Sequence, residues 1–194
     1  GPSIFPATSL GLRIWAQPLS TVYFQGVVLD GVPGNPHDHR GTHVKFDKED
    51  GALVTAELGY LVGADESPTQ LFGKYALGAW FYTTTFEDLI DVDENGEAVK
   101  RTGNRGVYAL AEQKVYGEND DPAQGLALFA RFGIANGNLN QFDYYLGYGL
   151  VYTGLVPGRD EDQIGFAVSR AHNGTKYKQL MEIESGIIAE GHDI

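Results

Sequence analysis

The chain has 194 residues, of which 26 are acidic and 14 basic, and its net charge is −12 with no cysteine. These totals predict one domain and exclude disulfides and thiolate metal sites, while an acidic chain without a basic stripe argues against nucleic-acid binding. No run approaches the ~18 to 20 consecutive apolar residues of a membrane-spanning helix.

Alternation of apolar and polar residues predicts a series of β-strands at the spacing of a meander. Clusters of Gly, Pro, Asn and Asp separate these stretches and predict turns. No amphipathic helix is evident, although 86–90 is compatible with a short helical turn. The predicted strands cover 10–17, 20–29, 51–63, 72–85, 104–116, 124–136, 141–154, 162–172 and 179–189, with 42–48 as a weaker candidate.

Each predicted strand has two unlike faces, because side chains alternate along a strand. One face is aliphatic with tyrosines near its ends, as in the run from Leu126 to Ile134. The same alternation places Met181 and Ile183 on the apolar face of the last strand. The second face collects charged residues and tryptophan, with glycines between them: Arg13, Trp15, Glu57, Lys74, Trp80, Arg131, Asp143, Glu182 and Glu184.

Two architectures produce this alternation. A soluble β-sandwich turns its polar faces to water, whereas an outer-membrane barrel turns aliphatic faces to lipid and polar faces to a lumen. The continuous aliphatic face with terminal tyrosines favours the barrel, as does a polar face that mixes both charge signs with Trp and Gly. We therefore expect residues 4–194 to form a single β-barrel domain or a fragment of one, and Gly1-Pro2-Ser3 to be a residual protease-cleavage sequence.

Two loops carry weak signals for metal binding. The stretch from Asp91 to Glu97 places Asp91, Asp93 and Asn95 at alternating positions with glycine sixth, like the start of a calcium loop. Position twelve is Thr102 rather than a bidentate glutamate, so a solvated hairpin loop is the favoured interpretation. Three histidines in seven residues, His37, His39 and His43, could bind a transition metal, but exposed loop histidines are favoured. We expect no cofactor.

The hairpin over 149–168 carries the most specific pattern in the chain, GLVYTGLVPGRDEDQIGFAV. Its core, G-L-x-Y-x-G-L-x-P-G-R-x-x-D-x-x-G over 149–165, resembles the OprB-type carbohydrate-selective porins. The segments GVYALAEQ (106–113), GLALFARFG (125–133), KYALGAWFYTTTFEDL (74–89) and YFQGVVLDG (23–31) are similar to the same family in the same order. The resemblance covers roughly 10–185.

This resemblance implies an all-β, antiparallel up-and-down transmembrane barrel of roughly sixteen strands in the bacterial outer membrane. It implies passive diffusion of sugars such as glucose, with carbohydrate and the lipid bilayer as partners and a homo-oligomer as one option. The chain supplies only about nine strands, so we expect either a partial barrel or one that closes differently. A soluble β-rich carbohydrate-binding module is the alternative function.

A sugar path needs charged groups for hydroxyls and aromatic rings for C–H faces, fixed along the lumen. Facing alone selects eight candidates, and for each the alternative role is a salt bridge that stiffens the barrel wall. No nucleophile elbow, phosphate loop or metalloprotease spacing is present, so we expect no enzyme. The candidates are Arg13, Trp15, Glu57, Lys74, Trp80, Glu112, Arg131 and Glu182.

Overall fold

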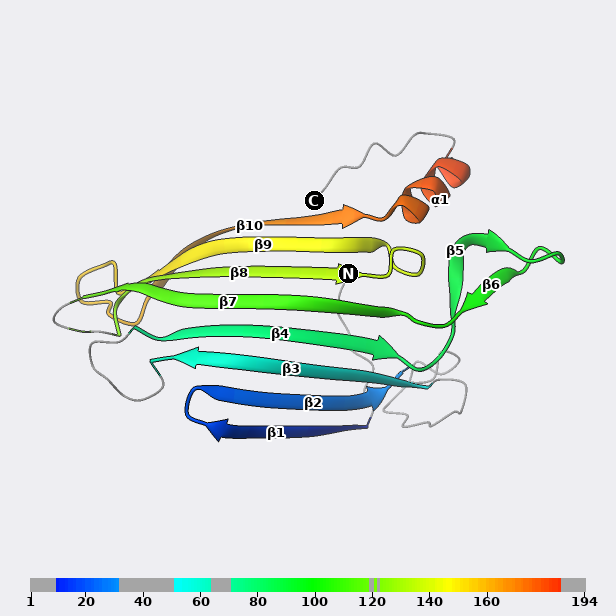
Figure 1. The fold of residues 1–194 in the computed structure, drawn as a ribbon. Helices are drawn as coiled ribbons and strands as arrows, with labels where there is room; N and C mark the ends of the chain where they lie inside the picture. The colour runs from blue at the N-terminus through cyan, green and yellow to red at the C-terminus, as the bar shows by residue number, and fades with distance from the viewer. Residues whose placement is uncertain (1–9, 32–50, 64–70, 119–120, 122, 186–194) are drawn as a thin grey trace.

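A computed structural model describes residues 10–31, 51–63, 71–118, 121 and 123–185. Its main body is one antiparallel sheet of eight strands in the order β1-β2-β3-β4-β7-β8-β9-β10 (Figure 1). These strands are β1 (Gly11–Leu19), β2 (Val22–Asp30), β3 (Ala52–Val62), β4 (Gly73–Tyr82), β7 (Arg105–Gly117), β8 (Gly125–Ala135), β9 (Phe142–Thr153) and β10 (Gln163–Asn173).

The sheet is an up-and-down meander, because each strand pairs with the next one along the chain except where a hairpin separates β4 from β7. This confirms the predicted all-β, antiparallel class. Within the described part of the chain nothing pairs with the outer edge of β1 or β10, so the sheet does not close on itself. The structure is therefore an open section of a barrel wall.

Strand register confirms the predicted faces. Residues paired directly across strands lie on the same face of a sheet. One such row is apolar from β2 to β9 and ends at Arg170 on β10; its apolar members are Phe24, Leu58, Leu77, Ala109, Phe132 and Leu146. The neighbouring row on the opposite side carries polar side chains and glycines. We refer to these two sides as the apolar face and the polar face.

The apolar face is uncovered by any second layer. Among the described residues only Tyr23, Ala76 and Leu139 are buried hydrophobic residues, whereas Leu77 and Phe166 of the apolar face are about two-thirds exposed, at 67% and 66%. A soluble sandwich buries its apolar face against a second sheet. An exposed aliphatic face on a single-layer sheet requires an apolar medium instead.

Two predictions about local structure were wrong. Residues 86–101 form a β-hairpin of β5 (Phe86–Val92) and β6 (Ala98–Arg101), which confirms the hairpin loop expected at 91–97 but not the helical turn at 86–90. The segment predicted as a ninth strand over 179–189 belongs instead to helix α1 (Thr175–Ser185), as far as the structure describes it. Helix formers Lys, Gln, Leu, Met and Glu dominate this segment, and their intrinsic preference outweighs the short alternating pattern.

Helix α1 is the helix found in the described residues. It is not long and apolar enough to cross a membrane. It lies with the β5–β6 hairpin beyond one end of the sheet (Figure 1). The helix contacts β5, and the backbone amide of Leu89 donates to the carbonyl of Asn138 in the β8–β9 turn. The hairpin, this turn and α1 thus form one assembly at the end of the wall.

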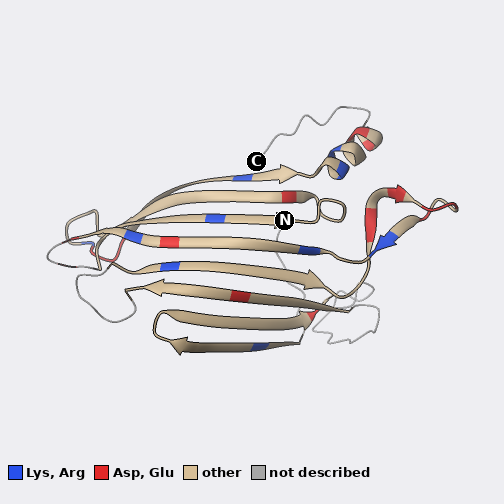
Figure 2. Ribbon diagram, in the orientation of Figure 1, with Lys and Arg blue, Asp and Glu red and all other residues tan. Residues whose placement is uncertain are grey.

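A cluster of charges joins α1 to the hairpin (Figure 2). The Lys176 ammonium lies 2.7 and 2.8 Å from the two oxygens of Asp88 and 2.8 Å from Asp91. Arg101 pairs with the same two carboxylates. Burial alone would raise the pKa of the Asp88 carboxyl, but hydrogen bonds from Lys176, two backbone amides and Arg101 outweigh burial and hold that pKa well below its ordinary value.

We expect Asp88→Asn to detach α1 from the hairpin. The side chain of Asp88 is fully buried, and its neutralisation leaves two cations facing only Asp91. Removing one partner of a buried pair costs about 3 kcal/mol. Hydrogen exchange of the α1 and β5 amides measures the loss, and Glu87→Gln, an exposed neighbour on β5, is the matched control.

Acid should have the same effect on this assembly. Because the folded-state pKa of Asp88 is depressed, its contribution is complete above the unfolded-state pKa of about 3.9 and is lost as pH falls toward the folded value. Exchange protection of α1 should therefore be constant near neutral pH and decline below about pH 4. Equal protection in Asp88→Asn and Glu87→Gln at neutral pH would contradict this role of Asp88.

Candidate functional site

The polar face is organised around the carboxylate of Glu57 on β3, which is only 5% exposed. One carboxylate oxygen accepts hydrogen bonds from the Tyr23 hydroxyl at 2.6 Å and the Gln25 amide at 2.9 Å. The other oxygen accepts from the Tyr108 hydroxyl at 2.8 Å. Arg13 donates to the Gln25 carbonyl at 2.8 Å, which extends the network to the edge strand β1. The buried charge is thereby fully hydrogen-bonded, as burial requires.

Aromatic rings of this face lie over glycines of neighbouring strands, in the space that a Cβ atom would occupy. A Cβ atom added to Gly59 would lie 1.9 Å from the ring of Tyr23, and one added to Gly78 would lie 2.1 Å from the ring of Tyr108. Because Gly78 on β4 has no side chain, Tyr108 on β7 reaches across that strand to Glu57 on β3. The same arrangement places Trp80 over Gly106 and Phe129 over Gly149.

More exposed charges surround this network. Arg131 on β8 pairs with Glu112 on β7 at 3.3 Å, and its guanidinium lies 5.8 Å from the ring centroid of Phe129. Lys74 lies opposite Glu112 in register, with its ammonium 5.4 Å from the ring centroid of Tyr23. The side chains of Arg131 and Glu112 are 55% and 45% exposed, so both remain accessible to a solute.

Seven of the eight residues selected by facing lie on the polar face of the sheet. Glu182 does not, because it lies on α1 and is exposed there. The placement of the other seven is given by register, and their role in binding remains a prediction. They are Arg13, Trp15, Glu57, Lys74, Trp80, Glu112 and Arg131.

Tyr23, Gln25 and Tyr108 are site residues that the sequence selection missed. Each alternates with apolar neighbours and therefore satisfied the facing criterion, but only charged residues and tryptophans were retained as candidates. Counting every polar side chain on that face would have included them. Their convergence on Glu57 depends on strand register, which periodicity does not reveal.

The structure commits the oxygens of the acidic loop to other partners. Asp91 pairs with Lys176 and Arg101, and one oxygen of Asp93 accepts from the backbone amides of Asn95 and Glu97. Within the described ranges no group of three His, Asp or Glu side chains could hold a metal ion. The histidine loop at 37–43 and the weak strand at 42–48 lie outside the described residues.

Comparison with known proteins identifies the family. A family model described as carbohydrate-selective porin, OprB family, matches residues 1–187. The chain belongs to the OprB family of carbohydrate-selective porins. Porin B of Pseudomonas aeruginosa strain PAO1 is 30% identical in an alignment over 189 residues that covers 92% of this chain and 40% of the relative.

Two solved structures of Pseudomonas putida OprB agree with this assignment. The high-pH structure superposes with a TM-score of 0.73 at 28% identity, over 91% of this chain and 44% of that one. The low-pH structure has a TM-score of 0.54 at 24% identity, over 84% and 40%, and supports the fold. The chain thus spans less than half the length of these relatives.

Membership of the OprB family places the protein in the outer membrane of a Gram-negative bacterium. The eight-stranded sheet is accordingly part of a transmembrane barrel. Within the described part of the chain the sheet has eight of the nine strands that were predicted, since the last predicted strand falls on α1. Nothing in the comparisons supports the soluble binding module.

We expect Gly59→Ala to destabilise the OprB-family wall by displacing the ring of Tyr23 from its hydrogen bond to Glu57. The added methyl group overlaps the ring, and such overpacking typically costs roughly 1–3 kcal/mol. Urea titration followed by tyrosine fluorescence measures the change. Gly133→Ala is the matched control, because a Cβ at this polar-face glycine meets its nearest atom at 3.7 Å. Equal stability of the two variants would refute the proposed packing.

Proposed function

We propose that this chain forms part of the wall of an outer-membrane channel for the passive, selective diffusion of carbohydrates. One observation carries the proposal: the single sheet of this OprB-family chain has a polar face and, on its other side, an apolar face. The polar face holds a fixed network of aromatic and charged side chains, and the apolar face is uncovered.

On the apolar side, the wall matches a lipid-facing band. Tyr60 and Tyr75 are paired in register toward one end of the strands, and the rings of Tyr116 and Tyr152 lie 6.4 Å apart at the same end. Tyr144 occupies the opposite end of β9. Aromatic girdles bordering an aliphatic band of this kind are characteristic of outer-membrane barrels. The end that carries the long connections 31–51 and 83–104 is then the extracellular end.

On the polar side, two kinds of residue have different roles. Glu57 is buried, and its carboxylate accepts hydrogen bonds from three side chains of the wall, so it positions the rings of Tyr23 and Tyr108 rather than meeting a sugar. Trp15 and Arg131 are exposed and supply contacts for the solute. An exposed ring such as that of Trp15 can stack on the C–H face of a pyranose, and an exposed charge such as that of Arg131 offers hydrogen bonds to hydroxyls.

Such contacts suit conduction rather than retention. A conducting path needs sites that favour entry but release the solute readily. Exposed charges in water bind neutral hydroxyls weakly, and flat rings add modest stacking. The proposed role is transport, and no catalytic step is part of it.

Leu77→Lys tests which face meets lipid. Leu77 lies midway along β4 on the apolar face, and a lysine at the bilayer midplane costs about 2 kcal/mol or more. We expect a lower yield of protein inserted into lipid vesicles. Ser169→Lys places the same charge on the polar face of β10 and should insert normally. Equal insertion of the two variants would contradict the assigned facing.

Arg131→Gln tests the sugar path. Hydrogen bonds to charged groups contribute about 1.5–3 kcal/mol when fully formed. Water competes for the exposed Arg131, so its loss should lower the apparent affinity for glucose by about tenfold or less, the factor for about 1.4 kcal/mol. Sugar-induced block of the ion current through the complete protein in a planar bilayer measures this affinity. Arg159→Gln, in the β9–β10 turn, removes an equal charge outside the polar face and is the control. Unchanged block in Arg131→Gln, with conductance preserved, would leave Arg131 as wall structure only.

A further inference from the structure

A basic side chain lies on the apolar face near the end of the sheet that carries the long connections. Arg105 is the first residue of β7 and is exposed, and register pairs it with Phe81, an apolar-face residue that is 47% exposed. Among the described residues no ion pair or side-chain hydrogen bond includes Arg105. Its guanidinium is therefore available to an anion from outside the protein.

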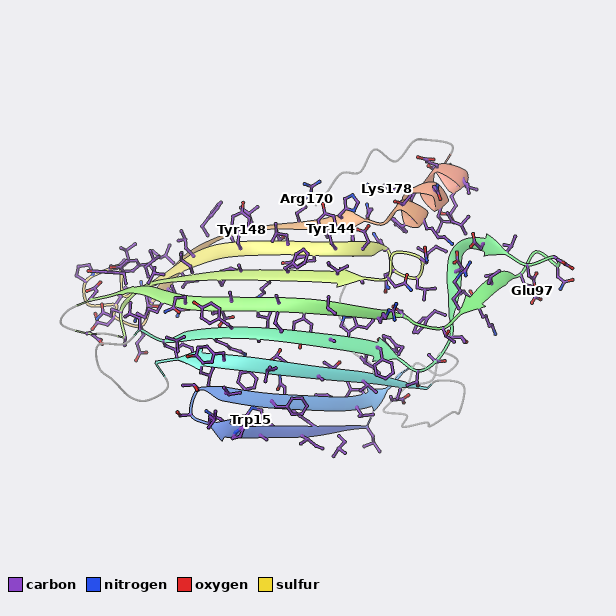
Figure 3. All side chains as sticks on the ribbon, viewed as in Figure 1. Trp15, Glu97, Tyr144, Tyr148, Arg170 and Lys178 are labelled. Carbon is purple, nitrogen blue, oxygen red and sulfur yellow. The ribbon has the colours of Figure 1, made fainter. Side chains whose placement is uncertain are left out.

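Arg105 lies at the border of the aliphatic band and not at its middle. Its register partner Phe81 is four residues beyond Leu77 on β4, which is about 13 Å along the strand and about 10 Å along the membrane normal for a strand tilted by about 40°. Half of an apolar band about 25 Å tall is about 12 Å. Tyr144 belongs to the next row inward and lies toward the same end of the strands as α1 (Figure 3). The long side chain of Arg105 thus reaches headgroup level.

The surface beside Arg105 is hollowed, and its lining changes from polar to apolar. The hollow is open and has a volume of about 870 Å³. At its rim lie Arg105 and two residues of the turn after β8, Asn136 and Asn138. Alanines paired in register, Ala56 and Ala79, lower its floor. The apolar part of the lining consists of Val54, Ala56, Ala79, Phe81, Val107 and Ile134.

The hollow continues along the rim toward α1. A second hollow of about 610 Å³ shares Ile134, Asn136 and Asn138 with the first, and it extends to Tyr144 and Thr175. Asn138 is exposed, and within the described ranges its side-chain amide makes no hydrogen bond. The rim therefore offers polar donors, and the floor offers a continuous apolar surface. This gradient is complementary to an amphiphile with an anionic head.

We propose that Arg105 binds the phosphate of an anionic lipid headgroup in the outer leaflet, while the acyl chains of that lipid occupy the adjoining hollow. The proposal rests on the apolar face meeting lipid, which is part of the proposed function. A guanidinium presents five donors in a planar fork that matches phosphate geometry. A free phosphate ion would leave the apolar lining uncovered, so the hollow favours a lipid as the source of the phosphate.

The experiment counts the lipids retained by the complete protein in a non-ionic detergent, by native mass spectrometry during titration with phosphatidylglycerol or phosphatidylcholine. Both lipids have a phosphate, but only phosphatidylglycerol has a net negative head. A basic residue near an anionic lipid contributes about a fivefold factor, so Arg105→Gln should weaken phosphatidylglycerol binding by about fivefold. Phosphatidylcholine binding should change by no more than about twofold. Because Arg105 is exposed and unpaired, this variant should fold normally.

Two variants control for the charge. Arg105→Lys keeps the positive charge and should retain the preference for phosphatidylglycerol. Arg159→Gln removes a positive charge from the β9–β10 turn, at the opposite end of the strands, and should leave lipid binding unchanged.

A second pair of variants tests the hollow independently of the charge. Ala79→Phe fills the floor and should weaken the binding of both lipids by a similar factor, about fivefold or more, without changing the preference between them. Ala130→Phe is the matched control, because Ala130 is an exposed apolar-face alanine outside this hollow. Equimolar inorganic phosphate should compete poorly, since it has no chains to cover the apolar lining.

Four results would overturn the lipid site. They are an unchanged phosphatidylglycerol preference in Arg105→Gln, an equal loss in Arg159→Gln, an equal effect of Ala79→Phe and Ala130→Phe, and competition by equimolar inorganic phosphate, which would assign the site to the free anion. Sugar-dependent conductance of the same wild-type sample separates this proposal from the proposed function. Conductance without lipid preference overturns only the lipid site, whereas absence of both membrane insertion and conductance overturns the proposed function as well.

Discussion

The hydrogen-bond ladder between neighbouring strands is the interaction on which the rest of this structure depends. In hydrocarbon an unpaired backbone group has no water to satisfy it, so a sheet can span the membrane only if each strand is paired on both sides. Six of the eight strands meet this condition in the described part of the chain, while β1 and β10 have one open edge each. Eight alternating strands leave these two edges antiparallel to each other. Both edges are therefore compatible with a barrel in which further strands complete the sheet and every neighbouring pair is antiparallel.

Pairing also determines how the polar face can be filled. With no second layer to pack against, large aromatic rings gain contacts only by packing over adjacent strands, and glycine residues on those strands provide the space. Tyr23 over Gly59 and Tyr108 over Gly78 follow this rule, and Glu57 fixes both hydroxyl groups. Glycine in a strand weakens it in isolation, and a ring covering the exposed backbone offsets that weakness. The polar face of β10 carries only small residues where it pairs with β9, from Gly165 to Ala171, which leaves room for large side chains beside it.

Sequence periodicity predicted the part of the fold that obeys a two-residue repeat. Both faces of the strands from 105 to 173 were correct, because burial and lipid contact act on alternate residues. Periodicity failed where the chain leaves the sheet: Met181 and Ile183 alternate with Glu182 and Glu184, yet they belong to a helix docked by Lys176 onto Asp88. The site was predicted only as a list of inward residues. The contact between Glu57 and Tyr108 joins β3 to β7 across β4, and it depends on the register of three strands together.

In the proposed channel, the geometry separates residues that shape the wall from residues that a solute could touch. Glu57 is the charge best fixed in the wall, yet its oxygens already accept three hydrogen bonds, and displacing one would leave a buried charge partly unsatisfied. A passing sugar cannot compete for them without that loss. Arg131 and Glu112 form a longer, solvent-exposed ion pair, which contributes little net free energy to stability. In the proposed sugar path, exchange of such a pair for sugar hydroxyls would change the free energy little in either direction, which is the condition for passage without trapping.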